Sequence, residues 1–64
     1  MTVSKIKVDI VLANRKQTAK SFCEEVGISR NRFYTIMNSK NVAPRTVGRL
    51  AEALNVAVTD ILED

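Results

Sequence analysis

The sequence contains no histidine, no tryptophan and a single cysteine, Cys23. One cysteine excludes an internal disulfide, and without histidine the usual zinc-ligand spacings are missing. The longest apolar run, Ile10 to Ala13, is far too short to cross a membrane, and no apolar leader follows Lys5 and Lys7. Internal repeats and low-complexity segments are also missing. We therefore expect one domain over residues 1–64, located in the cytoplasm without membrane contact.

The residue types that carry catalysis are equally scarce. The sequence shows no histidine, no pair of carboxylates beside a glycine-rich loop and no serine nucleophile with a base. Cys23 falls on the inward side of an expected helix, so we interpret it as a small core residue rather than a nucleophile. We expect no enzyme activity, no metal site and no cofactor.

Two long stretches of the sequence each carry charges of one sign only, the first basic and the second acidic. Between Ile28 and Leu50 there are five basic residues and no acidic one, whereas from Ala51 to Asp64 there are four acidic residues and no basic one. A basic region without acidic neighbours is typical of a surface that binds a polyanion. The exposed aromatic platform used by readers of single-stranded RNA is missing, because only Tyr34 is expected to be free. The pattern favours double-stranded nucleic acid as the partner.

The first helix is expected near the beginning of the chain. Val8, Val11 and Leu12 follow the spacing of an amphipathic helix over residues 4–15. The same region is rich in β-branched residues and would also suit a strand. No second strand-like stretch exists to pair with it, so a strand would leave its backbone groups unmatched. Residues 1–3 are expected to form a loose arm.

Two further helices are separated by only three residues. Thr18 is a good N-cap for a helix over residues 19–26, and Gly27 can end that helix in the left-handed conformation. Ser29 is the next N-cap, so the following helix begins at Arg30. Two helices joined by a short turn containing glycine have the sequence form of a helix-turn-helix. The isoleucine of the turn is expected to fill the space between them.

The last part of the chain predicts two more helices. Pro44 fits the first turn of one helix, and Asn55 can end it in the left-handed conformation. Gly48 inside this helix is unfavourable and indicates close packing against another helix. Residues 59–63 are expected to form a short fifth helix. The fold class is therefore all-α, a compact five-helix domain.

The helix that begins at Arg30 has two chemically different sides. At about 100° per residue, Phe33, Ile36 and Met37 share one side, which suits a core. The opposite side carries hydrogen-bonding groups, from Arg30, Asn31, Tyr34, Thr35 and Asn38. A helix this short is marginal alone, so the rest of the chain must hold it in place.

These elements resemble the lambda-repressor/Cro family of helix-turn-helix DNA-binding domains, the XRE-type transcriptional regulators. The similarity covers residues 6–62, and its most informative parts are Gly27 to Phe33, Arg49 to Val56 and Asp60 to Leu62. The resemblance implies the lambda-repressor-like fold, with the second and third helices forming the helix-turn-helix.

The sequence departs from the family pattern at four positions. Ala19 stands where the family usually has a glutamine that anchors to phosphate, so that contact must be weaker or come from elsewhere. Lys16 and Gln17 stand where glycine and leucine are common, so the connection between the first two helices is expected to be built differently. Ser39 replaces a glycine and would be strained if that position needs a positive φ.

The resemblance implies that the helix beginning at Arg30 enters the major groove of DNA. Arg30 can form a bidentate fork with guanine, while Asn31 can both donate to and accept from adenine. Tyr34 and Thr35 lie one turn later and are expected to reach the next base pairs, where either can contact a thymine methyl group. The residues expected to contact phosphates are Thr18, Lys20, Arg32, Asn38, Lys40, Asn41 and Arg45.

A single small domain reads few base pairs, so specific binding usually requires two copies on a palindromic operator. Val58 and Leu62 are expected to contribute to the homodimer contact; the alternative is that they close the monomer core. The resemblance implies a sequence-specific transcriptional regulator, a small Cro-like repressor of phage, plasmid or chromosomal origin, with no small-molecule effector. The alternative function is a protein-interaction module, antitoxin-like or an adaptor, on the same fold.

Overall fold

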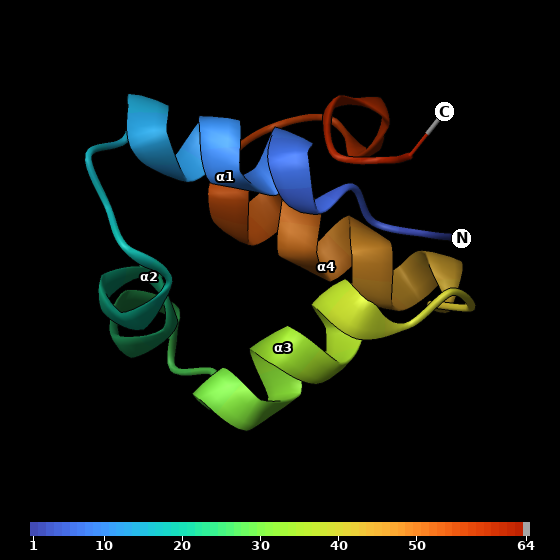
Figure 1. Cartoon of the computed structure of the whole chain (residues 1–64), viewed down its shortest axis with the longest axis horizontal. Coiled ribbons are helices and arrows are strands. Elements are labelled where there is room, and N and C mark those ends of the chain that lie inside the picture. The colour runs from blue at the N-terminus through green and yellow to red at the C-terminus, as the bar shows by residue number, and fades with distance from the viewer. Residues whose placement is uncertain (64) are drawn as a thin grey trace.

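The structure is a computed structural model that describes residues 1–63. These residues form four α-helices and no strand, which confirms the all-α class. The helices are α1 (Lys5–Asn14), α2 (Ala19–Val26), α3 (Arg30–Asn38) and α4 (Pro44–Leu54). In Figure 1, α1 lies across α4, while α2 and α3 form the opposite side of the molecule.

The prediction of a fifth helix over residues 59–63 is wrong. Its place is taken by a single 3₁₀ turn, η1 (Val58–Asp60), which Asp60 closes by accepting a hydrogen bond from the Ala57 N–H at 3.0 Å. The chain cannot continue as a helix because its next backbone groups bond elsewhere: the Ile61 carbonyl accepts from the Ser4 N–H, and the Glu63 N–H donates to the Thr2 carbonyl.

Residues 1–3 are not a loose arm. Val3 is 1% exposed and forms an isolated antiparallel bridge with Leu62. The Met1 amine donates to the Val42 carbonyl at 3.0 Å, and the Val42 N–H donates back to the Met1 carbonyl at 2.7 Å. These bonds fix the N-terminal segment between the α3–α4 loop and the C-terminal segment. Burial of the apolar Val3 side chain in the core stabilises the same arrangement.

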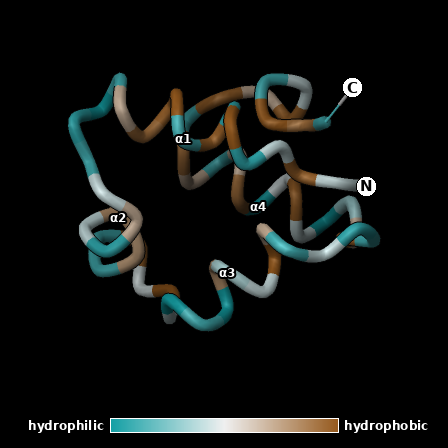
Figure 2. The backbone as a smooth tube through the Cα atoms, viewed as in Figure 1, coloured by the Kyte–Doolittle hydropathy of each residue, from teal (hydrophilic) through white to brown (hydrophobic). Residues whose placement is uncertain are grey.

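The core lies between the four helices, and Phe22 and Phe33 meet within it. Their rings approach edge to face with centroids 5.9 Å apart. Figure 2 shows hydrophilic residues on the outer turns of α3 and along the α1–α2 connection. The buried apolar residues are Val3, Val8, Leu12, Phe22, Cys23, Phe33, Ile36, Met37, Val42, Val47, Leu50, Ala51, Leu54 and Ile61.

The helix ends follow the sequence signals. Thr18 and Ser29 cap α2 and α3 through their side chains, accepting from the backbone three residues later. Gly27 and Asn55 end α2 and α4 with φ of 76° and 59°, both left-handed. Pro44 occupies the first turn of α4, where its missing N–H costs nothing. The predicted boundaries of α2 and α3 are therefore confirmed.

Two positions differ from their interpretation in the sequence. The expectation that Gly48 marks close helix packing is wrong, because a Cβ built there would meet no atom within 4 Å. At Ser39 the backbone is extended, with φ of −83°, so serine in place of glycine causes no strain. In the α1–α2 connection, the left-handed residue is Lys16, with φ of 56°.

Candidate nucleic-acid interface

The turn between α2 and α3 is fixed by backbone hydrogen bonds. The N–H groups of Gly27 and Ile28 both donate to the Cys23 carbonyl at 3.0 Å. Ile28 is half-buried and packs against the core, as the sequence predicts for a residue between two helices. The Ser29 hydroxyl then accepts from the Arg32 N–H at 3.1 Å and starts α3. The path of the turn is therefore set by backbone hydrogen bonds and by the Ser29 cap.

The inner side of α3 is its anchor. Phe33, Ile36 and Met37 are all buried, as expected. The Phe33 ring contacts Phe22 of α2 on one side and the ring of Tyr34 on the other, the latter with centroids 5.4 Å apart. Because this side is held in the core, the opposite side of α3 is presented to solvent in a defined orientation.

The outer side of α3 brings together the side chains predicted to read bases. Arg30, Asn31, Tyr34 and Thr35 are all exposed, and Asn38 follows on the same side. The Thr35 hydroxyl donates to the Asn31 carbonyl at 2.8 Å. Since that bond occupies the hydroxyl proton, the methyl group is the part of Thr35 best able to contact another molecule. None of these side chains forms an ion pair within residues 1–63.

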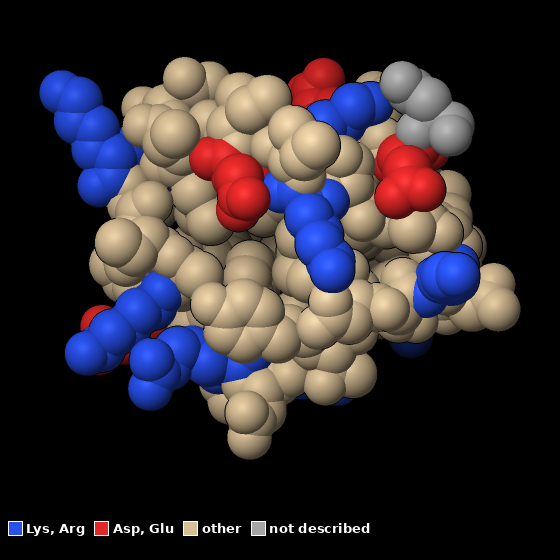
Figure 3. All heavy atoms as spheres, viewed as in Figure 1, with Lys and Arg blue, Asp and Glu red and all other residues tan. Residues whose placement is uncertain are grey.

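The side chains predicted to contact phosphates are exposed on segments that flank α3. Thr18 and Lys20 lie at the start of α2, Lys40 and Asn41 in the α3–α4 loop, and Arg45 in the first turn of α4. The Thr18 hydroxyl already accepts from the Ser21 N–H, so only its proton is available to a phosphate. On the face shown in Figure 3, basic side chains lie at the edge near α2 and α3 and also over α1 and near the C-terminus, and most acidic ones lie over α1 and near the C-terminus.

The start of α4 is open to an anion. Its N-cap, Ala43, offers no side-chain hydrogen bond, and no acidic residue occurs in the first turn. The first N–H groups of a helix carry partial positive charge, and without a side-chain cap they can donate to another acceptor. Arg45 adds a full positive charge beside them. This helix end therefore suits a negatively charged group such as a phosphate.

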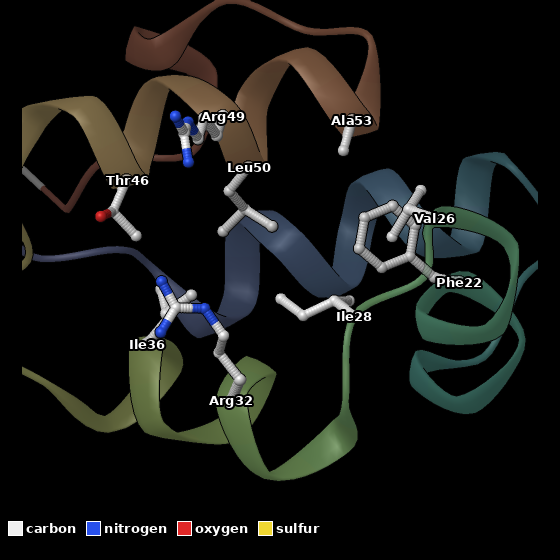
Figure 4. Close-up of a pocket in the computed structure, with 9 residues that line it drawn as sticks. All are labelled: Phe22, Val26, Ile28, Arg32, Ile36, Thr46, Arg49, Leu50 and Ala53. Atoms are coloured by element: carbon white, nitrogen blue, oxygen red, sulfur yellow. The ribbon is translucent and has the colours of Figure 1, made fainter.

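Arg32 lies apart from the outer side of α3. Its guanidinium group extends over a hollow between α2, α3 and α4, toward Thr46 (Figure 4). The hollow measures about 200 Å³, has Phe22 and Leu50 among its apolar lining, and carries Arg49 on its α4 wall. The sequence places Arg49 in the basic stretch and in the part that resembles the family, but its position at this hollow was not predicted, although it lies one helical turn after Arg45 on α4.

A polar network that the sequence did not predict holds α2 in position. Arg15 donates to the Leu54 carbonyl at 3.0 Å, to Gln17 at 2.9 Å and to Glu25 at 3.2 Å. Gln17 also donates to Glu25. The network joins the ends of α1 and α4 to α2, in the region where Lys16 and Gln17 depart from the family pattern. That departure was the available signal, because a half-buried glutamine needs hydrogen-bond partners.

Cys23 is buried on α2, as the sequence indicates. Burial raises the pKa of its thiol, and the nearby charge of Arg30 opposes the shift only in part. The thiol is thus neutral near pH 7 and a poor nucleophile. Within residues 1–63 no three metal-ligating side chains lie together, and no helix has the length and apolar character needed to cross a membrane.

Val58 and Leu62, predicted to contribute to a dimer contact, are half-buried and pack against the core. Leu62 also pairs with Val3, and its carbonyl accepts from Lys7 Nζ at 2.8 Å. Much of each side chain is therefore used within the monomer. This packing agrees with the alternative that they close the core of the monomer.

Comparison with known proteins gives one match. The family model of the Cro/C1-type HTH DNA-binding domain matches residues 7–64, which include all four helices apart from the first two residues of α1. Searches of curated proteins and of solved structures gave no significant match.

Proposed function

This chain belongs to the Cro/C1-type helix-turn-helix family of DNA-binding domains, and from that premise we propose that it is a sequence-specific repressor that inserts α3 into the major groove. The observation that supports this proposal is the contrast between the two sides of α3. Its inner side is anchored in the core, while its outer side presents exposed hydrogen-bonding groups with no ion-pair partner within residues 1–63.

In this proposal, Arg30 and Asn31 read the first bases because they lie in the first turn of α3. Arg30 donates two hydrogen bonds to guanine, and the Asn31 amide pairs with adenine. Tyr34 and Thr35 contact the bases that follow. The exposed position of all four side chains on one side of α3 supports this assignment.

The flanking segments supply affinity without sequence information. Lys20, Asn38, Lys40, Asn41 and Arg45 contact phosphates, with Arg45 helped by the open start of α4. Thr18 contributes through its hydroxyl proton alone. Arg32 reaches the phosphate chain from the side, because its guanidinium group lies over the hollow next to α4 rather than among the base-reading groups.

Two copies bind a palindromic operator and repress transcription by excluding polymerase from it. The small size of the domain supports this part of the proposal, because one recognition helix contacts only a few base pairs. Such a repressor acts in the cytoplasm, where the operator is, and needs no small-molecule effector.

Selection of bound sites from random duplex DNA tests the proposal directly. We expect a palindromic motif. On that motif, Arg30→Ala and Asn31→Ala should each weaken binding by about 1–3 kcal/mol and relax the preference at one base pair. Asn14→Ala, an exposed asparagine at the end of α1, is the matched control and should bind as the parent does.

Two results would contradict the proposal. If both α3 variants bound the selected motif as tightly as the parent, the outer side of α3 would not read bases. If the parent protein were not retained on mixed DNA at low salt, the chain would instead be a protein-interaction module, because phosphate contacts alone give salt-dependent retention.

A further inference from the structure

The outer side of α1 is apolar, in contrast to the outer side of α3. Ile6 is 73% exposed and Ile10 is 54% exposed. They lie one helical turn apart, so their side chains are neighbours on the same face, and Ala13 extends this face toward the end of α1. Helix propensity does not explain them, because β-branched residues form helices less readily than alanine, lysine or glutamate.

Two charged residues of opposite sign border this face. Lys5 and Asp9 are also one turn apart, both are exposed, and neither side chain has a hydrogen-bond or ion-pair partner within residues 1–63. The isoleucine pair and the charged pair have the same spacing along α1. If a second copy of α1 runs in the opposite direction, isoleucine therefore meets isoleucine and each charge meets its opposite.

We propose that the outer face of α1 is the surface through which two copies of this chain associate, antiparallel, about a two-fold axis. Ile6 of each copy packs against Ile10 of the other. In an antiparallel pair of helices the same flank of each helix meets, so Lys5 of each copy lies opposite Asp9 of the other. Both apolar side chains and both charges are thereby matched by one arrangement.

The placement of α1 also suits two copies on one DNA site, a point that rests on the proposed function. Lys5 and Asp9 line a hollow shared with Phe33, Tyr34 and Asn38 of α3, so this flank of α1 borders α3. Ile6 follows Lys5 and Ile10 follows Asp9 in the sequence. The face formed by the two isoleucines is therefore rotated about the axis of α1 by about 100°, roughly a quarter turn, from the flank that borders α3. A two-fold axis in the interface then runs from α1 toward α3 and places both copies of α3 on the same side.

The size of the face indicates a weak dimer. Stable complexes bury roughly 800 Å² on each partner, and two isoleucines, one alanine and an ion pair supply less than that. We therefore expect association at high protein concentration and cooperative binding when the two half-sites of an operator hold the copies together. Val58 and Leu62 are less suitable, because both pack against the core of their own chain.

Sedimentation equilibrium of the full chain without DNA tests the surface itself. The parent should show a monomer–dimer equilibrium, and the double variant Ile6→Glu, Ile10→Glu, which places like charges opposite each other, should associate at least ten times more weakly with unchanged circular dichroism. Val26→Gln, which removes an exposed aliphatic side chain from α2, is the matched control and should associate like the parent. A parent that stays monomeric, or a double variant that still associates, would overturn the proposal.

A charge exchange gives the sharper test. Lys5→Glu and Asp9→Lys should each weaken self-association, whereas an equimolar mixture of the two variants should associate as well as the parent, because each copy then meets only opposite charges. A mixture that associates no better than either variant alone would contradict the antiparallel arrangement. These measurements need no DNA, so they remain decisive even if the parent binds no operator.

Discussion

Helices α1 and α3 are of nearly equal length and differ in what they show to solvent. Each buries apolar residues in the same core, Val8 and Leu12 from α1 and three residues from α3. Outside, α1 shows aliphatic side chains and α3 shows hydrogen-bonding and basic ones. The inner sides of both helices stabilise the fold. The outer side of α1 is suited to contact with another protein chain, and the outer side of α3 is suited to contact with DNA.

The largest effect should come from the inner side of α3. Phe33→Ala removes a buried ring that contacts Phe22, and the expected loss of unfolding free energy is about 3–5 kcal/mol, a large part of what a domain of this size has. Urea denaturation followed by circular dichroism measures it. A loss below about 1 kcal/mol would mean that α3 is not anchored through this ring.

Substitution of two glycines tests how backbone conformation affects stability inside α4 and at the end of α2. Gly48→Ala should stabilise the protein by about 1 kcal/mol, because the site is helical and a Cβ there meets nothing. Gly27→Ala should destabilise it by about 1 kcal/mol although space is equally free, because φ of 76° is unfavourable for alanine. Thermal unfolding of both variants gives the sign of each change, and equal signs would contradict this interpretation.

On the outer side of α3, the contribution of a single methyl group, that of Thr35, to DNA binding can be measured. Since the Thr35 hydroxyl is bonded to the Asn31 carbonyl, Thr35→Val should keep operator affinity and Thr35→Ser should lose about 0.8 kcal/mol, the value of one buried methyl. Replacing the contacted thymine by uracil should reproduce the loss for the parent and leave the serine variant unaffected. Titration of labelled duplexes measures both, and a loss in the valine variant alone would assign the contact to the hydroxyl.

The smallest effect is expected on the outer side of α1. Ile6→Gln should change the free energy of unfolding by less than about 0.5 kcal/mol, because the side chain is largely exposed. Chemical denaturation at low protein concentration is the measurement. A loss comparable to that of a buried residue would place Ile6 in the core and weaken the comparison of the two helices.

Local signals in the sequence were sufficient for the middle of the fold. Caps, a left-handed glycine and a proline in a first turn act within four residues, so Ser29, Gly27 and Pro44 predicted the ends of α2, α3 and α4 directly. The errors lie where the outcome depends on distant residues. Val3 and Leu62 pair across the whole chain, and this pairing replaces both the loose arm and the fifth helix.

The candidate site was predictable to a similar degree. A helical period separates the two sides of α3, and the exposure of Arg30, Asn31, Tyr34 and Thr35 agrees with it. Their division into base and phosphate contacts stays a prediction. The position of Arg32 over a hollow, and the bonds that Arg15 makes to three segments, depend on how α2 and α4 pack, which no local pattern contains.

The bridge between Val3 and Leu62 makes the chain almost a ring. The Glu63 N–H already donates to the Thr2 carbonyl, so Thr2 and Glu63 lie side by side in the folded state. A short peptide could join them without displacing any helix, whereas in the unfolded chain the same link would remove many conformations. The fold has thus already brought residues 2 and 63 together, and a covalent closure would act mainly by limiting the conformations of the unfolded state.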